Sequence, residues 1–337
     1  MAQTFGVKYR PDTLDKLVGQ KSIIQILEQQ LKLRQFKNCY LFTGSTGIGK
    51  TTISRAFANA INRNQGSPIE IDAASNNGVD NIRNIIEDAK QRALDCEYKI
   101  YIIDEAHMLT TQSWNALLKC LEEPPMYTIF IFCTTDPQKI PATILNRVQR
   151  FNLTKLSTDE IRKRLQYVCE QEHLVNYDET IDYIAKIADG GMRDALSYLD
   201  KVSVLSNDLD IKNTLEILGD CSYTIFFSLV NALIDADEKS VISIVEDYYN
   251  KGNDLKLFIN QFIDFIMDLN KYCIFKDFQI IKIPQAFESD IKYATELENS
   301  HKYFNYLLDK LLEIKNLIKY DANKNTVLIM FIAILRG

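Results

Sequence analysis

Eight consecutive residues, "GSTGIGKT" from Gly44 to Thr51, have the types and spacing that bind a nucleotide phosphate. They fit G-x-x-x-x-G-K-S/T at every fixed position, between an apolar run and a stretch of helical period. The glycines let the backbone approach closely, so the loop amides and the next helix start can surround phosphate oxygens. We expect Lys50 to reach the β- and γ-phosphates and the Thr51 hydroxyl to bind Mg²⁺. The alternative is a glycine-rich turn with an exposed lysine. The predicted phosphate-binding residues are Gly44, Ser45, Thr46, Gly47, Ile48, Gly49, Lys50, Thr51 and Thr52.

Two carboxylates, Asp104 and Glu105, stand where the apolar run "KIYIID" ends. The end of a buried parallel strand is the usual position for functional groups. We expect Asp104 to hold Mg²⁺ and Glu105 to deprotonate the water that attacks the γ-phosphate; a solvated strand end is the alternative. His107 completes a "DEAH" sequence, but a lone histidine there is more often a packing or hydrogen-bonding residue. A helicase would need a second strand-rich domain, and 157–337 lack that pattern.

Three later residues have the types that sense or stabilise a transferring phosphate. Thr135 ends the run "TIFIFCTT", where its hydroxyl can bond the γ-phosphate or the attacking water. Arg147 lies between a short helical stretch and the last strand-like run, a place that suits a neighbouring subunit's nucleotide. Arg193, in "GGMRDAL", begins a helix and can fold back onto the γ-phosphate of its own chain. Taken singly, each is also an ordinary strand-end or surface residue, so their order along the chain carries the argument.

These groups need an α/β scaffold to position them, and residues 1–155 have its pattern. Apolar runs alternate there with stretches of helical period, which predicts a parallel sheet covered by helices on both faces. The predicted strands are 39–44, 69–72, 99–104, 128–135 and 149–153. The predicted helices between them are 21–34, 50–62, 79–94 and 112–122.

After Leu156 the strand pattern stops and only helical periods follow. Ser157 and Glu160 have the spacing of a capping box, and Gly219 is a plausible stop for a small bundle. From Cys221 onward, apolar residues recur at three- and four-residue spacing, as in buried helices. The predicted helices of the small bundle are 158–172, 178–188, 191–204 and 210–218.

The fold class that follows is α/β, with a parallel five-stranded sheet and helical additions. We predict a nucleotide-binding domain over 1–156, a helical lid over 157–220 and a helical domain over 221–337. The apolar run 327–335 is about half the roughly 20 residues needed to span a bilayer. It is expected to be a buried terminal helix or an oligomer contact.

The composition limits the class of protein but does not indicate its function. The chain has 46% hydrophobic and 25% charged residues and a net charge of −6, which argues against a surface coated in positive charge. Phosphates can still be held by helix N-termini and a few arginines. Seven cysteines form no Cys-x-x-Cys pair, so neither a disulfide framework nor a structural zinc site is expected. With no export-type segment at the N-terminus, we expect a reducing, cytoplasmic setting.

The order of these motifs resembles that of the AAA+ ATPases, and more narrowly of the sliding-clamp loaders. "HMLTTQSWNALLKCLEEPP" (107–125) and "GGMRDALS" (190–197) are similar to the loaders' signature and lid motifs. "TTDPQKIPATILNR" (134–147) looks especially like bacterial DNA polymerase III gamma/tau, and the chain also resembles replication factor C small subunits. "VKYRPDTLDKLVGQ" (7–20) resembles the N-terminal box beside the adenine, which implies contacts from Tyr9, Arg10, Pro11, Val18 and Gly19.

The resemblance implies ATP and Mg²⁺ as cofactors and gives each candidate residue a role. Lys50 and Thr51 would bind nucleotide and metal, Asp104 would bind the metal, and Glu105 would be the catalytic base. The roles of sensor 1, sensor 2 and trans-acting finger would belong to Thr135, Arg193 and Arg147. The segment "SNNGVDNIRN" (75–84) resembles the helix start that follows the DNA backbone in clamp loaders, although a solvated helix face has the same composition. The implied DNA contacts are Asn77, Gly78, Val79, Asp80 and Arg83.

Two departures from the family pattern stand out. Bacterial gamma/tau carries a four-cysteine zinc module after the phosphate-loop helix, whereas "NAINRNQGSPIEID" runs straight through. The finger motif is usually Ser-Arg-Cys, whereas this chain has Asn146, Arg147 and Val148. The arginine is retained, so its supporting contacts must differ from those of the family.

The function that the resemblance implies is an ATPase subunit of a ring-like, pentameric clamp loader. It would couple ATP binding and hydrolysis to loading of a sliding clamp onto primer–template DNA, with other loader subunits bound through the helical domain and no membrane involved. One alternative is another AAA+ motor, for branch migration or helicase loading, but the helices after 221 do not resemble a basic winged-helix domain. A second alternative is a non-hydrolysing structural subunit, against which the complete set of nucleotide motifs speaks.

Overall fold

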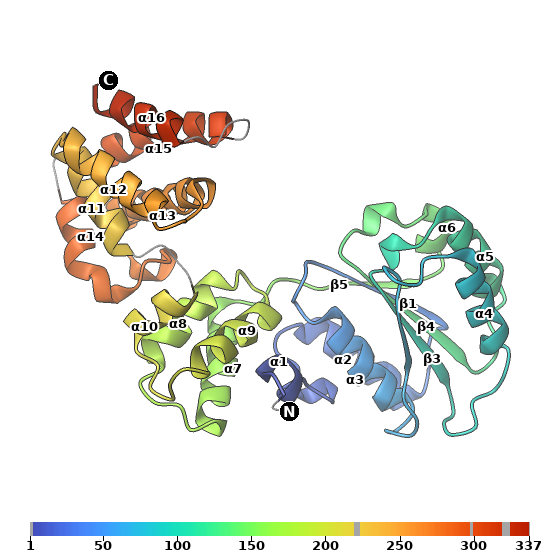
Figure 1. Ribbon diagram of the computed structural model, residues 1–337. Helices are drawn as coiled ribbons and strands as arrows, with labels where there is room; N and C mark the ends of the chain where they lie inside the picture. The colour runs from blue at the N-terminus through green and yellow to red at the C-terminus, as the bar shows by residue number, and fades with distance from the viewer. Residues whose placement is uncertain (1–2, 219–222, 297–298, 319–323, 337) are drawn as a thin grey trace. The chain divides into compact units, whose positions relative to one another are not determined.

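The computed structural model describes residues 3–218, 223–296, 299–318 and 324–336, which form two compact units (Figure 1). The first unit comprises Met1–Glu172 and Ala188–Asp200, and the second comprises His173–Ile187 and Lys201–Gly337. The predicted boundaries at 156 and 220 remain predictions about domains. Gly219 and Cys221, which the sequence placed at the second of these boundaries, lie outside the described residues.

A parallel sheet of five strands, in the order β2-β3-β4-β1-β5, organises the first unit. Its register aligns the strand ends, because Asp72 lies opposite Asp104 and Thr43 lies opposite Thr134. Polar residues that follow different strands are therefore gathered at one edge of the sheet. The strands are β1 (Cys39–Thr43), β2 (Ile69–Asp72), β3 (Lys99–Asp104), β4 (Thr128–Thr134) and β5 (Gln149–Asn152).

Helices cover both faces of this sheet, as the apolar strands predict (Figure 1). One face packs on α2 (Lys21–Leu33) and α3 (Lys50–Ile61), with strand residues such as Ile102 and Ile131 in that core layer. The other face packs on α4 (Val79–Ala89), α5 (Thr111–Glu122) and the short α6 (Ala142–Leu145). Alternate strand residues, such as Ile103 and Phe132, fill that second layer. The two-residue period of a strand thus builds two separate cores from one sheet.

The predicted strands and helices agree with the structure to within one or two residues, with one exception. The helix predicted over 79–94 ends at Ala89, so its last turn was wrong. The Lys99 ammonium donates to the Asp88 backbone oxygen (2.8 Å) and to the Asp88 carboxylate (2.7 Å), which binds the start of β3 to the end of α4. The segment between Ala89 and Lys99 must therefore turn back to bring Lys99 beside Asp88, and Leu94 in that segment is fully exposed.

Two lid helices and the N-terminal segment complete the first unit. They are α7 (Thr158–Gln171), the start of α9 (Met192–Ser203), α1 (Phe5–Lys8) and the short η1 (Leu14–Lys16). The predicted capping box at the start of α7 is present, with the Ser157 hydroxyl accepting from the Glu160 amide at 3.2 Å. Two further one-turn helices follow strands of the first unit, η2 (Ala106–Met108) and η3 (Pro137–Lys139). The second unit contains two others, η4 (Phe278–Ile280) and η5 (Gln285–Phe287).

The described residues of the second unit form helices joined by loops, as their spacing predicts, with one isolated bridge between Val175 and Asp208. Its core contains rings packed against one another, such as Phe226 against Phe258 and Phe262, with centroids 5.4 Å apart in both pairs. Val327, Phe331 and Ile334 of the terminal apolar run are buried in the same core. The helices are α8 (Asp178–Ile187), α10 (Ile211–Leu218), α11 (Tyr223–Ile234), α12 (Glu238–Asn250), α13 (Leu255–Phe275), α14 (Glu288–Thr295), α15 (Ser300–Ile318) and α16 (Lys324–Arg336).

No single helix among the described residues is both long and apolar enough to span a bilayer, and α10 and α11 reach that length and hydropathy only together, as a bent pair.

Candidate functional site

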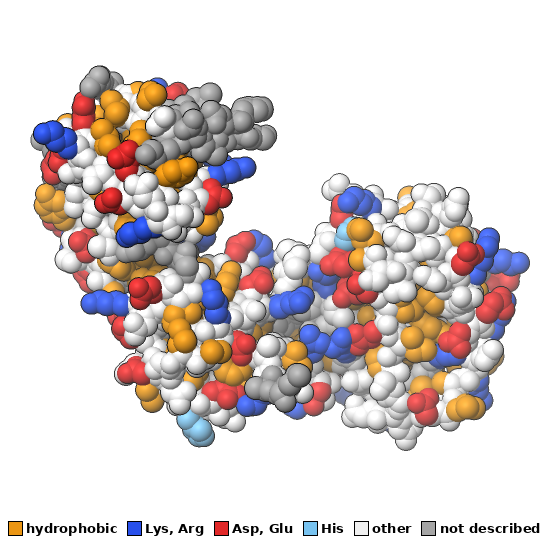
Figure 2. Space-filling view, in the orientation of Figure 1, with side chains coloured by type: hydrophobic (Ala, Val, Ile, Leu, Met, Phe, Trp, Pro, Cys, Tyr) orange, Lys and Arg blue, Asp and Glu red, His pale blue; other side chains and the backbone are white. Residues whose placement is uncertain are grey.

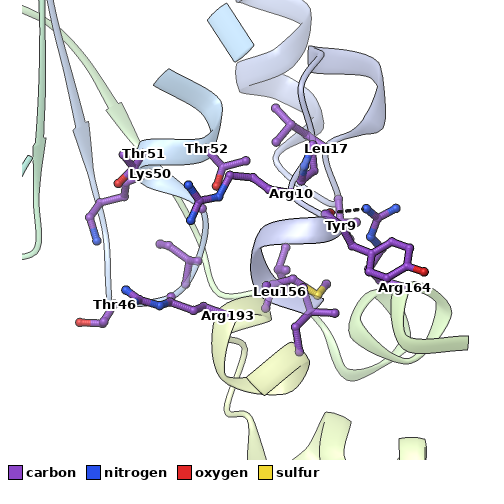
Figure 3. A pocket seen from close by; sticks show the side chains of 18 of the residues that line it. Tyr9, Arg10, Leu17, Thr46, Lys50, Thr51, Thr52, Leu156, Arg164 and Arg193 are labelled. Atoms are coloured by element: carbon purple, nitrogen blue, oxygen red, sulfur yellow. Dashed lines mark hydrogen bonds between the residues drawn. The ribbon is translucent and has the colours of Figure 1, made fainter. Parts of the chain in front are cut away.

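A pocket in the first unit lies where the loop after β1 meets the N-terminal segment and the lid helices (Figure 3). Most of the predicted nucleotide-site residues line it, although they come from four separate stretches of the chain. The predicted residues that line it are Tyr9, Arg10, Pro11, Val18, Thr46, Gly47, Ile48, Gly49, Lys50, Thr51, Thr52, Asp104, Glu105 and Arg193.

The glycine loop has the backbone shape of a phosphate cradle. Gly44, Gly47 and Gly49 all have positive φ angles, of 146°, 77° and 103°, which other residues rarely adopt. A Cβ on Gly44 would lie 2.8 Å from the Leu153 backbone oxygen, and one on Gly47 would lie 3.3 Å from the Asp194 carboxylate. Glycine is therefore required here both for backbone angle and for close packing, and the following helix α3 directs its first amides at the pocket. This loop fits a bound polyphosphate.

Lys50 is buried at the centre of the cradle, with 6% of its surface exposed. Its ammonium donates to the backbone oxygens of Gly44 (3.0 Å) and Ser45 (2.9 Å). These two predicted loop residues therefore contact the site through Lys50. Burial lowers the pKa of Lys50, while the nearby carboxylates of Glu105 and Asp104 oppose that shift. An anionic phosphate beside the ammonium would favour its charged form further.

The two predicted metal ligands are in contact. The Thr51 hydroxyl donates to the Asp104 carboxylate at 2.6 Å, across the space between α3 and the end of β3. A hydroxyl and a carboxylate oxygen are the hard oxygen ligands that Mg²⁺ prefers next to substrate phosphates. These side chains therefore fit the predicted ion.

Two side chains lie beside the same carboxylate oxygen of Glu105 at the sheet edge. The Thr135 hydroxyl donates to Glu105 Oε2 at 3.2 Å, and His107 Nδ1 lies 3.3 Å from that oxygen. His107 also lies 3.1 Å from the Thr134 hydroxyl and is only 13% exposed. Glu105 itself has a φ of 45°, an uncommon angle that aims it out of the line of the strand. The predicted base, sensor 1 and His107 thus form one cluster.

The N-terminal segment forms the opposite side of the pocket. The Arg164 guanidinium of α7 donates to the Tyr9 backbone oxygen at 2.7 Å, the dashed contact in Figure 3. The Tyr9 hydroxyl bonds Glu172, and its ring meets Tyr167 edge-on with centroids 6.3 Å apart. Burial and the Glu172 carboxylate raise the pKa of Tyr9. These contacts fasten the segment to the lid helix, so a ligand in the pocket would touch both.

Four cations surround the pocket, which suits a polyanionic ligand. They are Lys50, Arg10, Arg164 and Arg193, and Figure 3 shows Arg10 and Arg193 extending toward the loop from two different sides. The Arg193 amide donates to the Gly47 backbone oxygen at 3.2 Å, which brings the start of α9 onto the loop. Burial, followed by the charge of Arg55, lowers the pKa of Arg10.

Several pocket residues were missed by the sequence analysis. Arg164 lies in an amphipathic helix where an arginine normally faces solvent, so its sequence gives no signal of a site. The apolar ones follow or precede a recognisable motif, but only the folded chain brings them to the pocket. The additional lining residues are Gly6, Leu17, Leu156, Arg164, Met192 and Leu196.

Other predicted residues lie close to the pocket or away from it. Gly19 is behind the lining, where a Cβ would meet Leu156 at 2.5 Å. Arg147 follows α6, outside the residues that line the pocket, and its guanidinium contacts Glu122 at 2.6 Å. A finger for another subunit's nucleotide would have to lie outside its own pocket.

The predicted DNA contacts lie at the start of α4. Gly78 is the residue before the helix, and the Asn77 backbone oxygen accepts from the Ser113 hydroxyl of α5 at 2.6 Å. Arg83 is 67% exposed and lies 3.2 Å from Asp80. On the face drawn in Figure 2, acidic and basic side chains are interspersed, so no continuous basic surface marks a site there.

Three family models match successive parts of the chain. Residues 69–157 match the DNA polymerase III delta subunit, and 160–207 match the ATPase lid domain of the DNA polymerase III clamp loader subunit. Residues 209–332 match domain III of the DNA polymerase III subunits gamma and tau. The three matches follow one another through the lid and into the helical unit.

Individual proteins similar to this chain are also DNA polymerase III subunits. The Bacillus subtilis DNA polymerase III subunit tau is 37% identical over 78% of this chain and 51% of its own length. Mycoplasma genitalium subunit gamma/tau is 34% identical over 93% of this chain and 55% of its own length. This chain therefore spans about half the length of these two relatives.

Solved structures add a likeness in fold. The RuvB Holliday junction branch migration motor of Thermotoga maritima aligns with a TM-score of 0.53 at 17% identity, over 66% of this chain and 79% of that one. At that identity the likeness concerns the fold alone, which is that of the AAA+ P-loop ATPases. The DNA polymerase III subunit gamma of Buchnera aphidicola is 33% identical and aligns over 92% of this chain and 91% of its own length. At that identity and coverage, the chain belongs to the DNA polymerase III gamma/tau family.

Proposed function

We propose that this chain is an ATPase subunit of a clamp loader, which couples ATP binding and hydrolysis to loading of a sliding clamp onto primer–template DNA. The observation that carries the proposal is one pocket containing the buried Lys50, the bonded pair Thr51 and Asp104, and Glu105. Family membership supports the assignment to a DNA polymerase III assembly.

The residues of the pocket suggest how hydrolysis proceeds. The adenine would lie by Tyr9 and Val18, and the loop amides with Lys50 would hold the phosphates. Thr51 and Asp104 would hold Mg²⁺, which would supply positive charge next to the phosphates. Glu105 would take a proton from the attacking water while the water oxygen forms a bond to the γ-phosphorus. The bond between the γ-phosphorus and the bridging oxygen would break, and ADP would leave with that oxygen.

The position of Arg147 supports a reaction that is completed between subunits. A guanidinium outside its own pocket is available to a neighbouring nucleotide, where a finger typically accelerates hydrolysis by about 10³–10⁵-fold. An isolated chain is therefore expected to hydrolyse ATP slowly. Assembly would make hydrolysis efficient, with the second unit's apolar helices as the proposed contact.

The proposed macromolecular partners are a sliding clamp, other loader subunits and primer–template DNA. DNA would contact the start of α4, where the amides of Gly78 to Asp80 and the exposed Arg83 are available to phosphates. Ser113 connects this segment to α5, which begins shortly after Glu105. Contact with DNA could in this way influence the position of the catalytic base.

Steady-state ATPase assays of the assembled loader test the proposal. We expect stimulation by the clamp together with primed DNA, and loss of that activity in Lys50→Ala. Lys90→Ala is a matched control, because Lys90 lies in the same unit but is exposed and pairs only locally with Glu87. ATPase activity that is stimulated by branched DNA and indifferent to the clamp would favour a branch-migration motor instead. Absence of ATPase activity in every condition would favour a structural subunit.

A further inference from the structure

Arg147 has a carboxylate partner that comes from a different element of the first unit. Its Nη2 lies 2.6 Å from Oε1 of Glu122, the last residue of α5. Its Nη1 donates to the Thr143 backbone oxygen at 2.5 Å. The two ends of the guanidinium are thus bound by separate groups, which fixes both its position and its plane.

This arrangement leaves donors for a second ligand. A guanidinium has five N–H groups in a rigid fork, and the two contacts use one on each terminal nitrogen. The remaining N–H groups can be offered to a phosphate while Glu122 and the Thr143 carbonyl stay bound. Arg147 is 34% exposed, so the guanidinium is also accessible from outside.

The location of Glu122 makes the contact unusual. A carboxylate in the last turn of a helix faces the negative end of the helix dipole, where cations are favoured. Glu122 is followed by a second acidic residue, Glu123, which increases the local negative charge. The Arg147 guanidinium offsets this charge on Glu122, so the pair holds together the end of α5 and the loop before β5.

The residues beside Arg147 do not provide this support. Asn146 is exposed, and Val148 packs against the apolar cluster beneath the sheet. The family's usual Ser-Arg-Cys neighbours are absent, and the contacts of Arg147 come instead from α5 and from the carbonyl of α6.

We propose that Glu122 is a positioning residue for Arg147, holding the guanidinium in the orientation in which it reaches the γ-phosphate of a neighbouring subunit. This inference rests on the proposed function, because it requires Arg147 to act in trans. Glu122 itself touches no nucleotide. An exposed ion pair contributes little to folding, so removing Glu122 should alter the reaction more than the stability.

A mixing experiment with full-length chains separates the finger from its support. The acceptor is Arg147→Ala, which keeps its own pocket but supplies no finger, and the donor is Lys50→Ala, which supplies a finger but cannot hydrolyse. Mixing the two, with clamp and primed DNA, should restore ATPase activity that neither has alone. If this mixture stays inactive, the trans finger of the proposed function is wrong, and the role of Glu122 is overturned with it.

Donors that also carry a change at 122 then test the inference. With Glu122→Ala we expect about tenfold less restored activity, as expected for a misplaced catalytic group. Glu122→Gln retains an acceptor oxygen and should lose less. The matched control is a donor with Glu123→Gln, which changes the adjacent charge and should restore activity fully. Nucleotide affinity of the acceptor sites should be the same with every donor.

Two results would overturn the inference while leaving the finger intact. One is a Glu122→Ala donor that restores as much activity as the donor with Glu122. The other is a Glu122→Ala donor that no longer unfolds at the same temperature or no longer co-assembles with the acceptor, which would assign Glu122 to folding or assembly.

Discussion

The two units of the molecule use polar side chains in different ways. In the first unit, contacts join residues far apart in the chain, as between Thr51 and Asp104 or between Thr135 and Glu105. In the second unit, buried hydroxyls bond backbone oxygens both near in the chain, as for Thr295 with Ile291, and far away, as for Thr180 with Leu209. The first pattern gathers carboxylates and hydroxyls at the strand ends beside a pocket, whereas the second satisfies polar groups within apolar packing. We therefore expect substitutions in the first unit to affect catalysis and substitutions in the second unit to affect stability.

The largest expected effect comes from Glu105, the base proposed for the first unit. Glu105→Gln should lower kcat of the assembled loader by about a thousandfold, or ~4 kcal/mol, because it removes the proton acceptor. Nucleotide affinity and the unfolding midpoint should change little. Single-turnover hydrolysis and a nucleotide titration of the same variant provide the measurements. A variant that kept its activity would break the distinction between the units.

The second unit's core gives the complementary prediction. Phe262 of α13 is fully buried among other rings, so Phe262→Ala should lower the free energy of unfolding by about 3 kcal/mol through the cavity it leaves. Phe275→Ala, in the same helix but 66% exposed, is the control and should be nearly neutral. Denaturant unfolding measures both. Weakened nucleotide binding by Phe262→Ala in the folded chain would contradict the proposed separation.

A smaller effect is expected from His107, which lies beside the proposed base Glu105. His107→Ala should lower kcat by about tenfold without changing nucleotide affinity, because Glu105 would lose one of the two side chains that lie beside its carboxylate. His107→Asn can retain an N–H donor near the same place and should recover part of the activity. His301→Ala, an exposed histidine in α15, is the control. Equal activity of the alanine variants at 107 and 301 would show that His107 does not orient the base.

The smallest effect concerns a helix end. Ser157→Ala removes the cap of α7 and should destabilise the chain by about 1 kcal/mol, which thermal unfolding can measure. Because α7 also provides Arg164 to the pocket, we expect nucleotide to recover part of the lost stability. A variant that is as stable as the original chain would show that the capping box is redundant.

Local patterns predicted the elements well because they are set by nearby residues. The glycine loop, the alternating strands and the Ser157 capping box all have short-range signals in the sequence. The overlong helix at 79–94 was an error of the same kind, since apolar spacing continued past Ala89 while the bond between Lys99 and Asp88 required the chain to turn.

The contacts that were missed all depend on the fold. Arg164 reaches the backbone of Tyr9 across 155 positions of the chain, and Glu122 reaches Arg147 across 25. Neither pair has a spacing that a motif would show. The family resemblance could name the finger and the adenine box, but the groups that hold them in place become visible only when the elements are packed.

The central claim is that the pocket of the first unit holds ATP through Lys50 and the glycine loop. Calorimetric titration of the full chain with MgATP tests it most directly, using Lys50→Ala beside the exposed control Lys90→Ala. We predict one nucleotide per chain, with affinity weakened about tenfold or more by the change at 50 and unchanged by the change at 90. Equal affinities for the original chain and Lys50→Ala, with both folded, would contradict the account.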